Sequence, residues 1–309
     1  MQDSSRLIAI GIDVGGTQTR VAAVDRMGQI LARYCHRTDE TDGADRLITW
    51  LTGAVEDIRD EVGVGSSVDI RLGVALPGTL DQRRRLVVRS VNLPFLEGYP
   101  FIDELSRRAG HTAVLFTDAE AATWSEYVSC ASRAGRFVHL RLGTGIACGV
   151  VVEGRLQRLD AHRGQHLDAL VVDSTPGARP CPCGRRGCLE TIASGRAVEE
   201  CAREVGYING IVSLRQAWER GDETAVDLIQ NVTDALTEAV NNLATLFEPS
   251  VICLGGGVVT GLPCLLEQTM ARLQAVRNEN GEAPMSVQPA RLGDDAGIIG
   301  AAMLAIHPQ

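Results

Sequence analysis

The chain has 309 residues, of which 45% are hydrophobic, and its formal net charge is −9. This length allows two domains with separate cores, while the negative charge and the lack of a basic tail exclude a general affinity for nucleic acid. No apolar run is long enough to cross a bilayer and the first residues show neither a basic segment nor a cleavage site, so we expect a cytoplasmic protein with reduced thiols and with no membrane or nucleic-acid partner.

The first part of the chain predicts two successive hairpins followed by alternating helices and strands. Apolar runs at residues 6–13, 20–25 and 30–34 are separated by glycine-containing turns, which excludes a simple strand–helix–strand start. The elements expected next are a helix at 47–62, a buried strand at 70–78, a helix at 100–110 and a strand at 112–118 that ends on a carboxylate.

The second part repeats the opening pattern and then becomes more helical. Residues 137–156 place a Gly-Thr turn between two apolar strands, as residues 11–25 do, which suggests two related halves that each offer a hairpin loop to a shared cleft. A strand at 249–259 and a terminal helix at 295–306 are also expected. A long helix over 225–247 is predicted to bury one face, because its apolar residues recur at helical spacing. These residues are Val232, Leu236, Val240, Leu243 and Phe247.

Three glycine-rich turns follow apolar strands: Asp13-Val14-Gly15-Gly16-Thr17, Gly143-Thr144-Gly145 and Gly255-Gly256-Gly257. Glycine lets backbone N–H groups approach an anion without interference from a Cβ atom. One such turn usually just reverses the chain, but three of them at strand ends favour nucleotide binding. None has Walker or Rossmann spacing. The pattern suits a nucleotide held between two domains, with Asp13 holding Mg²⁺ through water or orienting phosphate oxygens.

The segments "GIDVGGT", "TDAEAATWSE", "LGTGIACGVV", "CPCGRRGCLE" with "ASG", and "LGGGV" together resemble the motifs of the ROK family of sugar kinases and sugar-responsive repressors. They follow the family's order from Gly11 to the C-terminal "GIIGAAMLA". The resemblance implies an α/β, two-domain actin/hexokinase-like (ribonuclease H-like) fold with an inter-domain cleft and a zinc-binding motif. A small domain is expected at 1–118 with 298–309, and a large domain at 119–297.

Cys181, Cys183 and Cys188 have the C-x-C-x4-C spacing with which the family binds a structural zinc ion. Three thiolates this close fit tetrahedral Zn²⁺, which needs a fourth ligand. The alternative is three reduced thiols in a turn. Gly184 and Gly187 favour the metal, because a tight wrap around an ion needs unusual φ values.

The fourth zinc ligand is where the chain departs from its relatives. The family's G-E-x-G-H segment corresponds to "GQHLDALVVD", and alignment on Gly164 places Gln165 at the Glu, Leu167 at the second Gly and Asp168 at the His. We expect Asp168 to complete the zinc site, with His166 as the alternative. Gln165 and Asp168 are also expected to contact the substrate, so the zinc is predicted to be retained while the sugar contacts are changed.

Asp118 occupies the catalytic position of the family's N-D-A-N motif. Phosphoryl transfer to an alcohol needs a base that accepts the hydroxyl proton, and the resemblance gives this role to Asp118, which would otherwise be a helix cap. Thr117 and Glu120 replace the two Asn residues, which is expected to alter hydroxyl recognition. The same register implies that Glu190 contacts the sugar. The residues expected to line the pocket are Pro77, Gly78 and Asn92, the last with a turn role as its alternative.

These features together predict an ATP-dependent kinase for a primary hydroxyl, the 6-OH, of a hexose or amino-hexose. The phosphates of ATP–Mg²⁺ are expected on the loops at 15–17 and 143–145, with the adenosine near 255–257. A sugar-like cyclitol is the alternative substrate, and a non-catalytic sugar sensor is the alternative of another class. Retention of Asp13, Asp118 and the glycine turns argues against a sensor. A DNA-binding repressor is not expected, since only twelve residues precede Asp13. The family also implies a homodimer.

Overall fold

The computed structural model describes residues 9–65, 70–81, 83–130, 135–158, 170–280 and 285–306. The chain forms two compact units, one made of residues 1–129, 155–165 and 294–309, the other of residues 130–154 and 166–293. Both units combine a mixed sheet with helices, as the predicted α/β fold requires. None of the helices in the described ranges has the length and hydropathy needed to cross a membrane.

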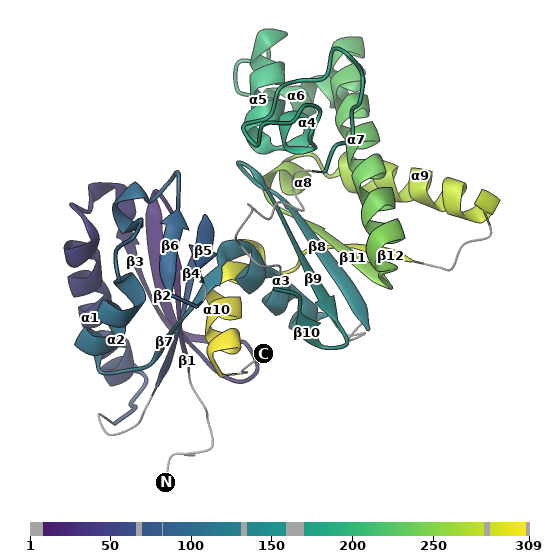
Figure 1. The fold of residues 1–309 in the computed structure, drawn as a ribbon. Helices are drawn as coiled ribbons and strands as arrows, with labels where there is room; N and C mark the ends of the chain where they lie inside the picture. Colours follow the sequence, from purple (N-terminus) through teal and green to yellow (C-terminus); the bar gives the residue numbers. More distant parts are fainter. Residues whose placement is uncertain are drawn as a thin grey trace. The chain divides into compact units, whose positions relative to one another are not determined.

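The first unit is built on a five-stranded sheet with the order β3-β2-β1-β4-β7 (Figure 1). The first three strands are antiparallel, which confirms the two predicted hairpins, whereas β1, β4 and β7 run parallel. The strands are β1 (Ala9–Val14), β2 (Gln18–Val24), β3 (Ile30–Arg37), β4 (Arg71–Leu76) and β7 (Ala113–Thr117), and a separate hairpin is formed by β5 (Thr79–Asp81) and β6 (Leu86–Arg89).

Helices cover both faces of this first sheet. The helices α1 (Ala44–Glu61) and α2 (Phe101–Ala109) lie on one face, and α3 (Asp118–Ser129) and α10 (Ala296–Ile306) lie on the other (Figure 1). Successive side chains of a strand point to opposite faces. The large residues of β1 therefore point to α1 and α2, where they join the main core of the unit, and the small ones point to α10.

The α10 face is packed backbone against backbone. A Cβ atom on Gly73 would lie 1.8 Å from the Ala301 carbonyl oxygen, and one on Gly11 would lie 2.0 Å from the Ile298 carbonyl oxygen. The α3 helix approaches α10 in the same way, since a Cβ on Gly300 would lie 1.7 Å from a backbone oxygen of α3. The Ser125 hydroxyl of α3 also donates a hydrogen bond of 2.8 Å to the Ala296 carbonyl at the start of α10. The two helices are thus fixed to each other and to the sheet.

The second unit repeats the arrangement of the first. Its strands follow the order β9-β8-β11-β12, with β8 and β9 antiparallel and with β8, β11 and β12 parallel. The pair β8–β9 with β11 corresponds to the pair β1–β2 with β4, so the repeat predicted from the sequence is confirmed. The strands are β8 (Arg136–Leu142), β9 (Ile146–Val152), β11 (Val251–Gly255) and β12 (Ser286–Pro289). The short strand β10 (Arg155–Leu156) follows β9 in the chain, and its residues belong to the first unit.

The long helix of the second unit buries the face that its sequence predicted. Val232, Leu236, Val240 and Leu243 are almost completely buried in the core that the helix forms with β8 and β11. Phe247 is half-buried at the end of the helix. The helices of this unit are α4 (Glu190–Ala193), α5 (Gly195–Glu204), α6 (Ile211–Glu219), α7 (Glu223–Phe247), α8 (Gly257–Gly261) and α9 (Cys264–Asn280).

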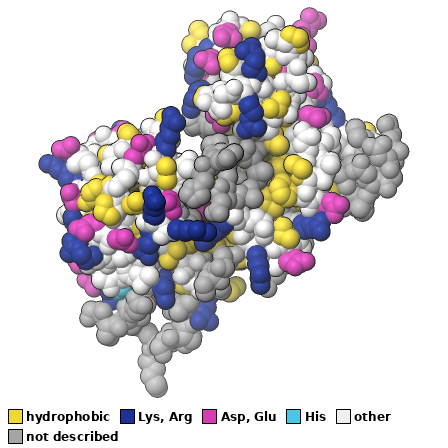
Figure 2. Space-filling view, viewed as in Figure 1, with side chains coloured by type: hydrophobic (Ala, Val, Ile, Leu, Met, Phe, Trp, Pro, Cys, Tyr) yellow, Lys and Arg dark blue, Asp and Glu magenta, His cyan; other side chains and the backbone are white. Residues whose placement is uncertain are grey.

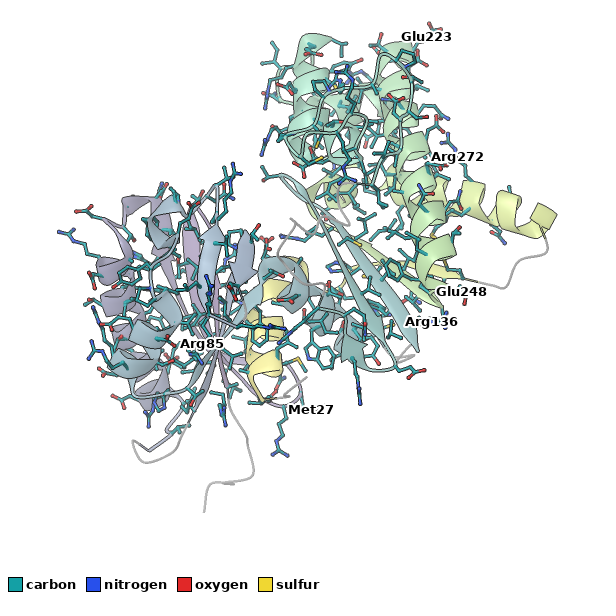
Figure 3. All side chains as sticks on the ribbon, viewed as in Figure 1. Met27, Arg85, Arg136, Glu223, Glu248 and Arg272 are labelled. Atoms are coloured by element: carbon teal, nitrogen blue, oxygen red, sulfur yellow. The ribbon has the colours of Figure 1, made fainter. Side chains whose placement is uncertain are left out.

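The chain contains no lysine, so arginine supplies the basic side chain of every ion pair described. Arg136 at the start of β8 pairs with Glu248 after α7, with 2.6 Å between Nη1 and Oε2 (Figure 3). In the first unit, Arg85 lies 2.9 Å from the Asp103 carboxylate and donates to the Ala113 carbonyl. On the face drawn in Figure 2, arginine and acidic side chains are interspersed.

The backbone packing of α10 predicts that Gly73→Ala destabilises the protein, because the added methyl group overlaps a carbonyl of α10. We expect a loss of about 3 kcal/mol or more in the free energy of unfolding, measured by urea denaturation. Gly53→Ala is the matched control, since Gly53 lies within α1 with open space at its Cβ. That substitution should stabilise the protein by about 0.5–1 kcal/mol. Equal effects of the two substitutions would contradict the packing argument.

Candidate active site

The predicted catalytic residues of the first unit lie at one edge of its sheet. The strands β1, β4 and β7 are parallel, so their carboxyl ends share this edge, which is where open α/β sheets bind ligands. Asp13 is the fifth residue of β1, and Asp118 directly follows β7. The sequence-predicted residues at or next to these strand ends are Asp13, Gly15, Gly16, Thr17, Pro77, Gly78, Asn92, Thr117 and Asp118.

Asp13 faces the beginning of α10. A Cβ atom on Gly297 would lie 3.1 Å from the Asp13 Oδ2 atom, so the carboxylate lies against the first turn of this helix. The N-terminal end of a helix carries partial positive charge and favours an anion there. Ala296 and Gly297 have no bulky side chain, which leaves the carboxylate room at the helix end. An acid in this place suits a Mg²⁺ ion, which prefers oxygen ligands and retains water molecules.

The first glycine turn closes the β1–β2 hairpin and uses part of its own backbone to do so. The Gly15 N–H donates a hydrogen bond of 3.0 Å to the Gln18 carbonyl, and the Thr17 carbonyl accepts one of 2.8 Å from the Thr38 N–H. Among the described residues, the amides of Gly16 and Thr17 have no acceptor. The capacity of this turn to bind phosphate therefore lies with these two amides, and the Gly15 amide has a structural role.

Asn92 lies beside this turn, and Pro77 and Gly78 contact Arg89 and Ser90, which precede Asn92 in the chain. Gly78 has a φ of +128°, and a Cβ atom there would lie 2.3 Å from the Arg89 carbonyl oxygen. The Ser90 hydroxyl donates a hydrogen bond of 2.7 Å to the Pro77 carbonyl. A Cβ atom on Gly16 would lie 3.0 Å from the Asn92 Cβ. Asn92 is exposed. Its side chain therefore lies next to the glycine turn, which agrees with a place at the edge of a ligand site.

Asp118 is the first residue of α3 and is half-buried. Its Oδ1 atom accepts a hydrogen bond of 2.9 Å from the Ala119 N–H. On either side of it, Thr117 and Glu120 bind each other reciprocally: the Thr117 N–H donates to Glu120 Oε2 at 2.8 Å, and the Glu120 N–H donates to Thr117 Oγ1 at 3.0 Å. This is a capping box, which satisfies two backbone donors at the start of a helix.

Glu120 is a carboxylate in a largely apolar place. Only 15% of its side chain is exposed, and burial raises its pKa above the ordinary value. Arg158 opposes this shift from a distance of 3.8 Å between Nε and Glu120 Oε1. The Arg158 guanidinium also lies over the Phe116 ring, 5.2 Å from its centroid. The sequence analysis did not single out Arg158.

The two glycine turns of the second unit lie against each other. Gly256 has a φ of +94°, and a Cβ atom on it would lie 2.3 Å from the carbonyl oxygen of Leu142, the residue before Gly143. The carbonyls of Gly143 and Thr144 accept hydrogen bonds from the N–H groups of Gly195 and Arg196, at 2.7 and 3.2 Å. Gly143, Thr144, Gly145, Gly255, Gly256 and Gly257 thus form one backbone surface at the ends of β8 and β11 with the start of α5.

Glu190, a predicted sugar contact, lies beside this surface. It is the first residue of α4 and is half-buried. A Cβ atom on Gly145 would lie 3.8 Å from its Oε2 atom. The carboxylate therefore faces the second glycine turn within its own unit, and its contact with a sugar stays a prediction.

The three cysteines form a compact cluster. The Sγ atoms of Cys181, Cys183 and Cys188 all lie within 4.8 Å of one another, and those of Cys183 and Cys188 are 3.5 Å apart. Thiolates about 2.3 Å from a tetrahedral zinc ion are about 3.8 Å from each other, so the cluster fits this metal. Gly184 and Gly187 have φ values of +88° and +67°, as the sequence analysis expected.

The protonation of these thiols differs with their surroundings. A hydrogen bond from the Arg185 backbone lowers the pKa of Cys183 to about 7, whereas burial raises the pKa of Cys188 to about 12. A zinc ion binds thiolates and would deprotonate all three. The predicted fourth ligand, Asp168, its alternative His166, and the substrate contact Gln165 lie outside the described residues.

Comparison with known proteins gives the class of the chain. Residues 9–307 match the model of the ROK family. A glucokinase of Thermotoga maritima is 30% identical over 315 residues, which covers 97% of each chain. An N-acetylmannosamine kinase of Citrobacter koseri is 29% identical over 301 residues and covers 96% of this chain and 98% of its own. The crystal structure of a ROK hexokinase from Thermus thermophilus superposes with a TM-score of 0.84 at 29% identity, over 96% of this chain and 97% of that one.

These relatives show a phosphotransferase of the carbohydrate-kinase class, with an alcohol group as acceptor. The chain belongs to the ROK family, as its motifs predicted.

The cysteine cluster predicts that the purified protein contains one zinc ion per chain, measured by elemental analysis. Cys183→Ser should lose the zinc and lower the melting temperature, because an exposed Ser hydroxyl replaces a thiolate ligand without leaving a cavity. Cys35→Ser is the control, since Cys35 is also exposed and lies on β3 of the other unit. A full zinc complement in Cys183→Ser would mean that this thiol is not a ligand.

Proposed function

We propose that the protein transfers a phosphoryl group from ATP to a primary hydroxyl, the 6-OH, of a hexose or amino-hexose. The observation that supports this proposal is the placement of two acids, Asp13 and Asp118, at the same edge of one parallel sheet. Asp13 faces a helix N-terminus beside a glycine turn, and Asp118 begins the helix that follows β7. The chain's membership in a family with full-length kinase relatives is consistent with it.

The proposed role of Asp118 is that of a general base. A hydroxyl attacking a phosphorus atom becomes more nucleophilic as its proton is removed, and a carboxylate within hydrogen-bond reach accepts that proton. The helix-capping pair of Thr117 and Glu120 holds the backbone of Asp118 at the start of α3. Because the transition state needs mainly positioning and charge stabilisation, a fixed acid of this kind suffices.

The proposed roles of the glycine turns follow from their free amides. Gly16 and Thr17 offer backbone N–H groups beside Asp13, and Asp13 would hold Mg²⁺ through water at the phosphates. In the second unit, the Gly143 N–H donates a hydrogen bond of 2.9 Å to the Gly145 carbonyl, as the Gly15 N–H does within the first turn. We assign the amides of Thr144 and Gly145 to phosphate oxygens and the Gly255–Gly257 turn to the adenosine. Mg²⁺ would neutralise phosphate charge during transfer.

The proposed substrate follows from the replaced family residues. Gln165 and Asp168 stand where the family has Glu and His, and Glu120 and Thr117 stand where it has Asn. A carboxylate at position 168 facing the sugar ring would pair with an ammonium group, which is why an amino-hexose is included. The relatives are named as glucokinase and N-acetylmannosamine kinase. The homodimer expected from the family stays a prediction that light scattering on the purified protein checks.

Asp118→Asn tests the proposed base directly. The amide keeps the size of the side chain but accepts no proton, so turnover of the preferred sugar should fall at least about 100-fold. The measurement is ADP release under saturating ATP and Mg²⁺, with zinc content and melting temperature recorded to show an intact fold. Asp57→Asn, on the exposed side of α1, is the control and should retain full activity. Wild-type turnover by Asp118→Asn would refute the assignment.

A substrate screen tests the proposed acceptor. Wild-type protein is offered glucose, allose, mannose, 2-aminoglucose, N-acylhexosamines and cyclitols at equal concentration, and kcat/KM is measured for each. We expect the highest value for a hexose or an amino-hexose, and none for the matching 6-deoxy sugar, which lacks the accepting hydroxyl. If a cyclitol had the highest kcat/KM, the substrate would be a cyclitol rather than a hexose. Equal or better turnover of N-acetylmannosamine would show that the replaced residues have not changed the substrate preference. No turnover of any acceptor would favour a sugar sensor.

A further inference from the structure

Glu120 stands where the family has an amide, and its carboxylate is committed to the protein itself. One oxygen, Oε2, accepts the hydrogen bond of the Thr117 N–H at 2.8 Å, and the other, Oε1, faces Arg158 at 3.8 Å. Neither arrangement requires a substrate. Thr117 is likewise committed, because its hydroxyl accepts the Glu120 N–H. Thr117 and Glu120 therefore bond to each other on either side of Asp118 in the sequence, and Glu120 also pairs with Arg158.

Few other charged groups surround Glu120 and Arg158 at the beginning of α3. The helix packs against α10, β4 and β7. Of these elements, α10 and β7 have no charged residue, and β4 has only Arg71, at the end of the strand remote from Asp118. Within these elements, the charged groups at the beginning of α3 are Asp118 and Glu120, and Arg158 reaches Glu120 from the segment after β10. The other carboxylates in this layer are Glu126, two turns further along α3, and Asp13 at the end of β1.

We propose that Glu120, paired with Arg158, is a positioning residue for Asp118: it anchors the first turn of α3 and sets the balance of charge beside the catalytic carboxylate. The inference rests on the proposed kinase reaction, in which Asp118 accepts the hydroxyl proton. Two consequences follow, one for geometry and one for charge. The geometric one needs only a hydrogen-bond acceptor at position 120, whereas the electrostatic one needs the negative charge itself.

The electrostatic consequence has a definite sign. A negative Glu120 disfavours a second negative charge nearby and raises the pKa of Asp118, whereas the positive Arg158 lowers it. Removing the charge of Glu120 also leaves Arg158 uncompensated, so both effects act in the same direction. Glu120→Gln should therefore move the acidic limb of the pH profile of kcat/KM to lower pH, by roughly 0.5 pH unit. Arg158→Gln should move it to higher pH by a similar amount.

The experiment is a double-mutant cycle with Glu120→Gln, Arg158→Gln and the double variant, read as pH profiles of kcat/KM and as KM for the sugar. Glutamine retains an oxygen that accepts the Thr117 N–H, so the helix cap is preserved. The double variant is neutral as a pair, and its acidic limb should return close to the wild-type position. KM for the sugar should change less than twofold, because neither side chain is assigned a substrate contact in this scheme.

Asp25→Asn is the matched control. Asp25 is a buried carboxylate that accepts the backbone N–H groups of Met27 and Gln29, at 2.8 and 2.9 Å, and it follows β2 at the opposite edge of the sheet from Asp118. Its conversion to an amide should leave the pH profile unchanged. The proposal would be overturned if the acidic limb of the pH profile stayed in place in both Glu120→Gln and Arg158→Gln, or if it moved in the same direction in both. So would a large increase in KM for the sugar, which would assign Glu120 to substrate binding.

A second measurement tests the Glu120 environment without any activity. Because burial raises the pKa of Glu120 above 4.5, its stabilising contribution is present below that value and is lost as the pH rises through the folded-state pKa. The urea midpoint of the wild type should therefore fall relative to that of Glu120→Gln as the pH rises through this range. A constant difference would contradict the burial of the Glu120 carboxylate, whereas its pairing with Arg158 is tested by the double-mutant cycle. If the wild type phosphorylates no sugar, the proposed function fails, while this midpoint comparison still decides whether Glu120 is the buried charge described.

Discussion

The contact on which the first unit depends is the one between the backbone of α10 and the glycines of its sheet. At Gly11 and Gly73 the helix approaches so closely that no side chain fits between them, and at Gly300 the helix α3 approaches α10 in the same way. Such contacts gain dispersion energy over a long stretch of backbone, but they tolerate no added atom. They also fix where α10 and α3 begin. Those two beginnings lie beside Asp13 and at Asp118, so the packing of small residues determines the geometry of the acids.

The site is built mostly from backbone. The glycine turns of both units end strands, and their geometry follows from hydrogen bonds within the turns and to α5. In a chain without lysine, phosphate binding of this kind relies on N–H groups and on helix ends rather than on amine side chains. The acidic side chains proposed for the described part of the site, Asp13, Asp118 and Glu190, each begin or face a helix. Such a site is sufficient for phosphoryl transfer, because this reaction depends on positioning and charge stabilisation more than on covalent catalysis.

Much of this could be predicted from the sequence, because the relevant signals are local. The alternation of apolar residues predicted β1 to β4, and the helical spacing from Val232 to Leu243 predicted α7. The hairpin repeat and the cysteine spacing were equally visible. The helices α4 to α6 were not predicted, since they are short, α5 begins at Gly195 and α6 directly follows Gly210. The helix α3 was also missed, although "TDAE" has the T-x-x-E pattern of a capping box and immediately precedes it.

Other parts of the site could not be predicted from local pattern. Arg158 lies 38 positions after Glu120 in the chain, and no motif near either residue indicates that they pair. The use of the Gly15 amide within the hairpin, and the contact between Gly16 and Asn92, depend on how separate turns meet in space. Sequence analysis identified Thr117 and Glu120 as departures from the family, but their mutual hydrogen bonds are a property of the folded helix end.

The hydrogen bond from Ser125 to the Ala296 carbonyl has a mechanical consequence. It joins the second half of α3 to the first residue of α10, and at Gly300 the backbones of the two helices are in direct contact. Asp118 begins α3, and Asp13 on β1 lies against the first turn of α10. A joint displacement of these two helices would therefore change the surroundings of both carboxylates at once.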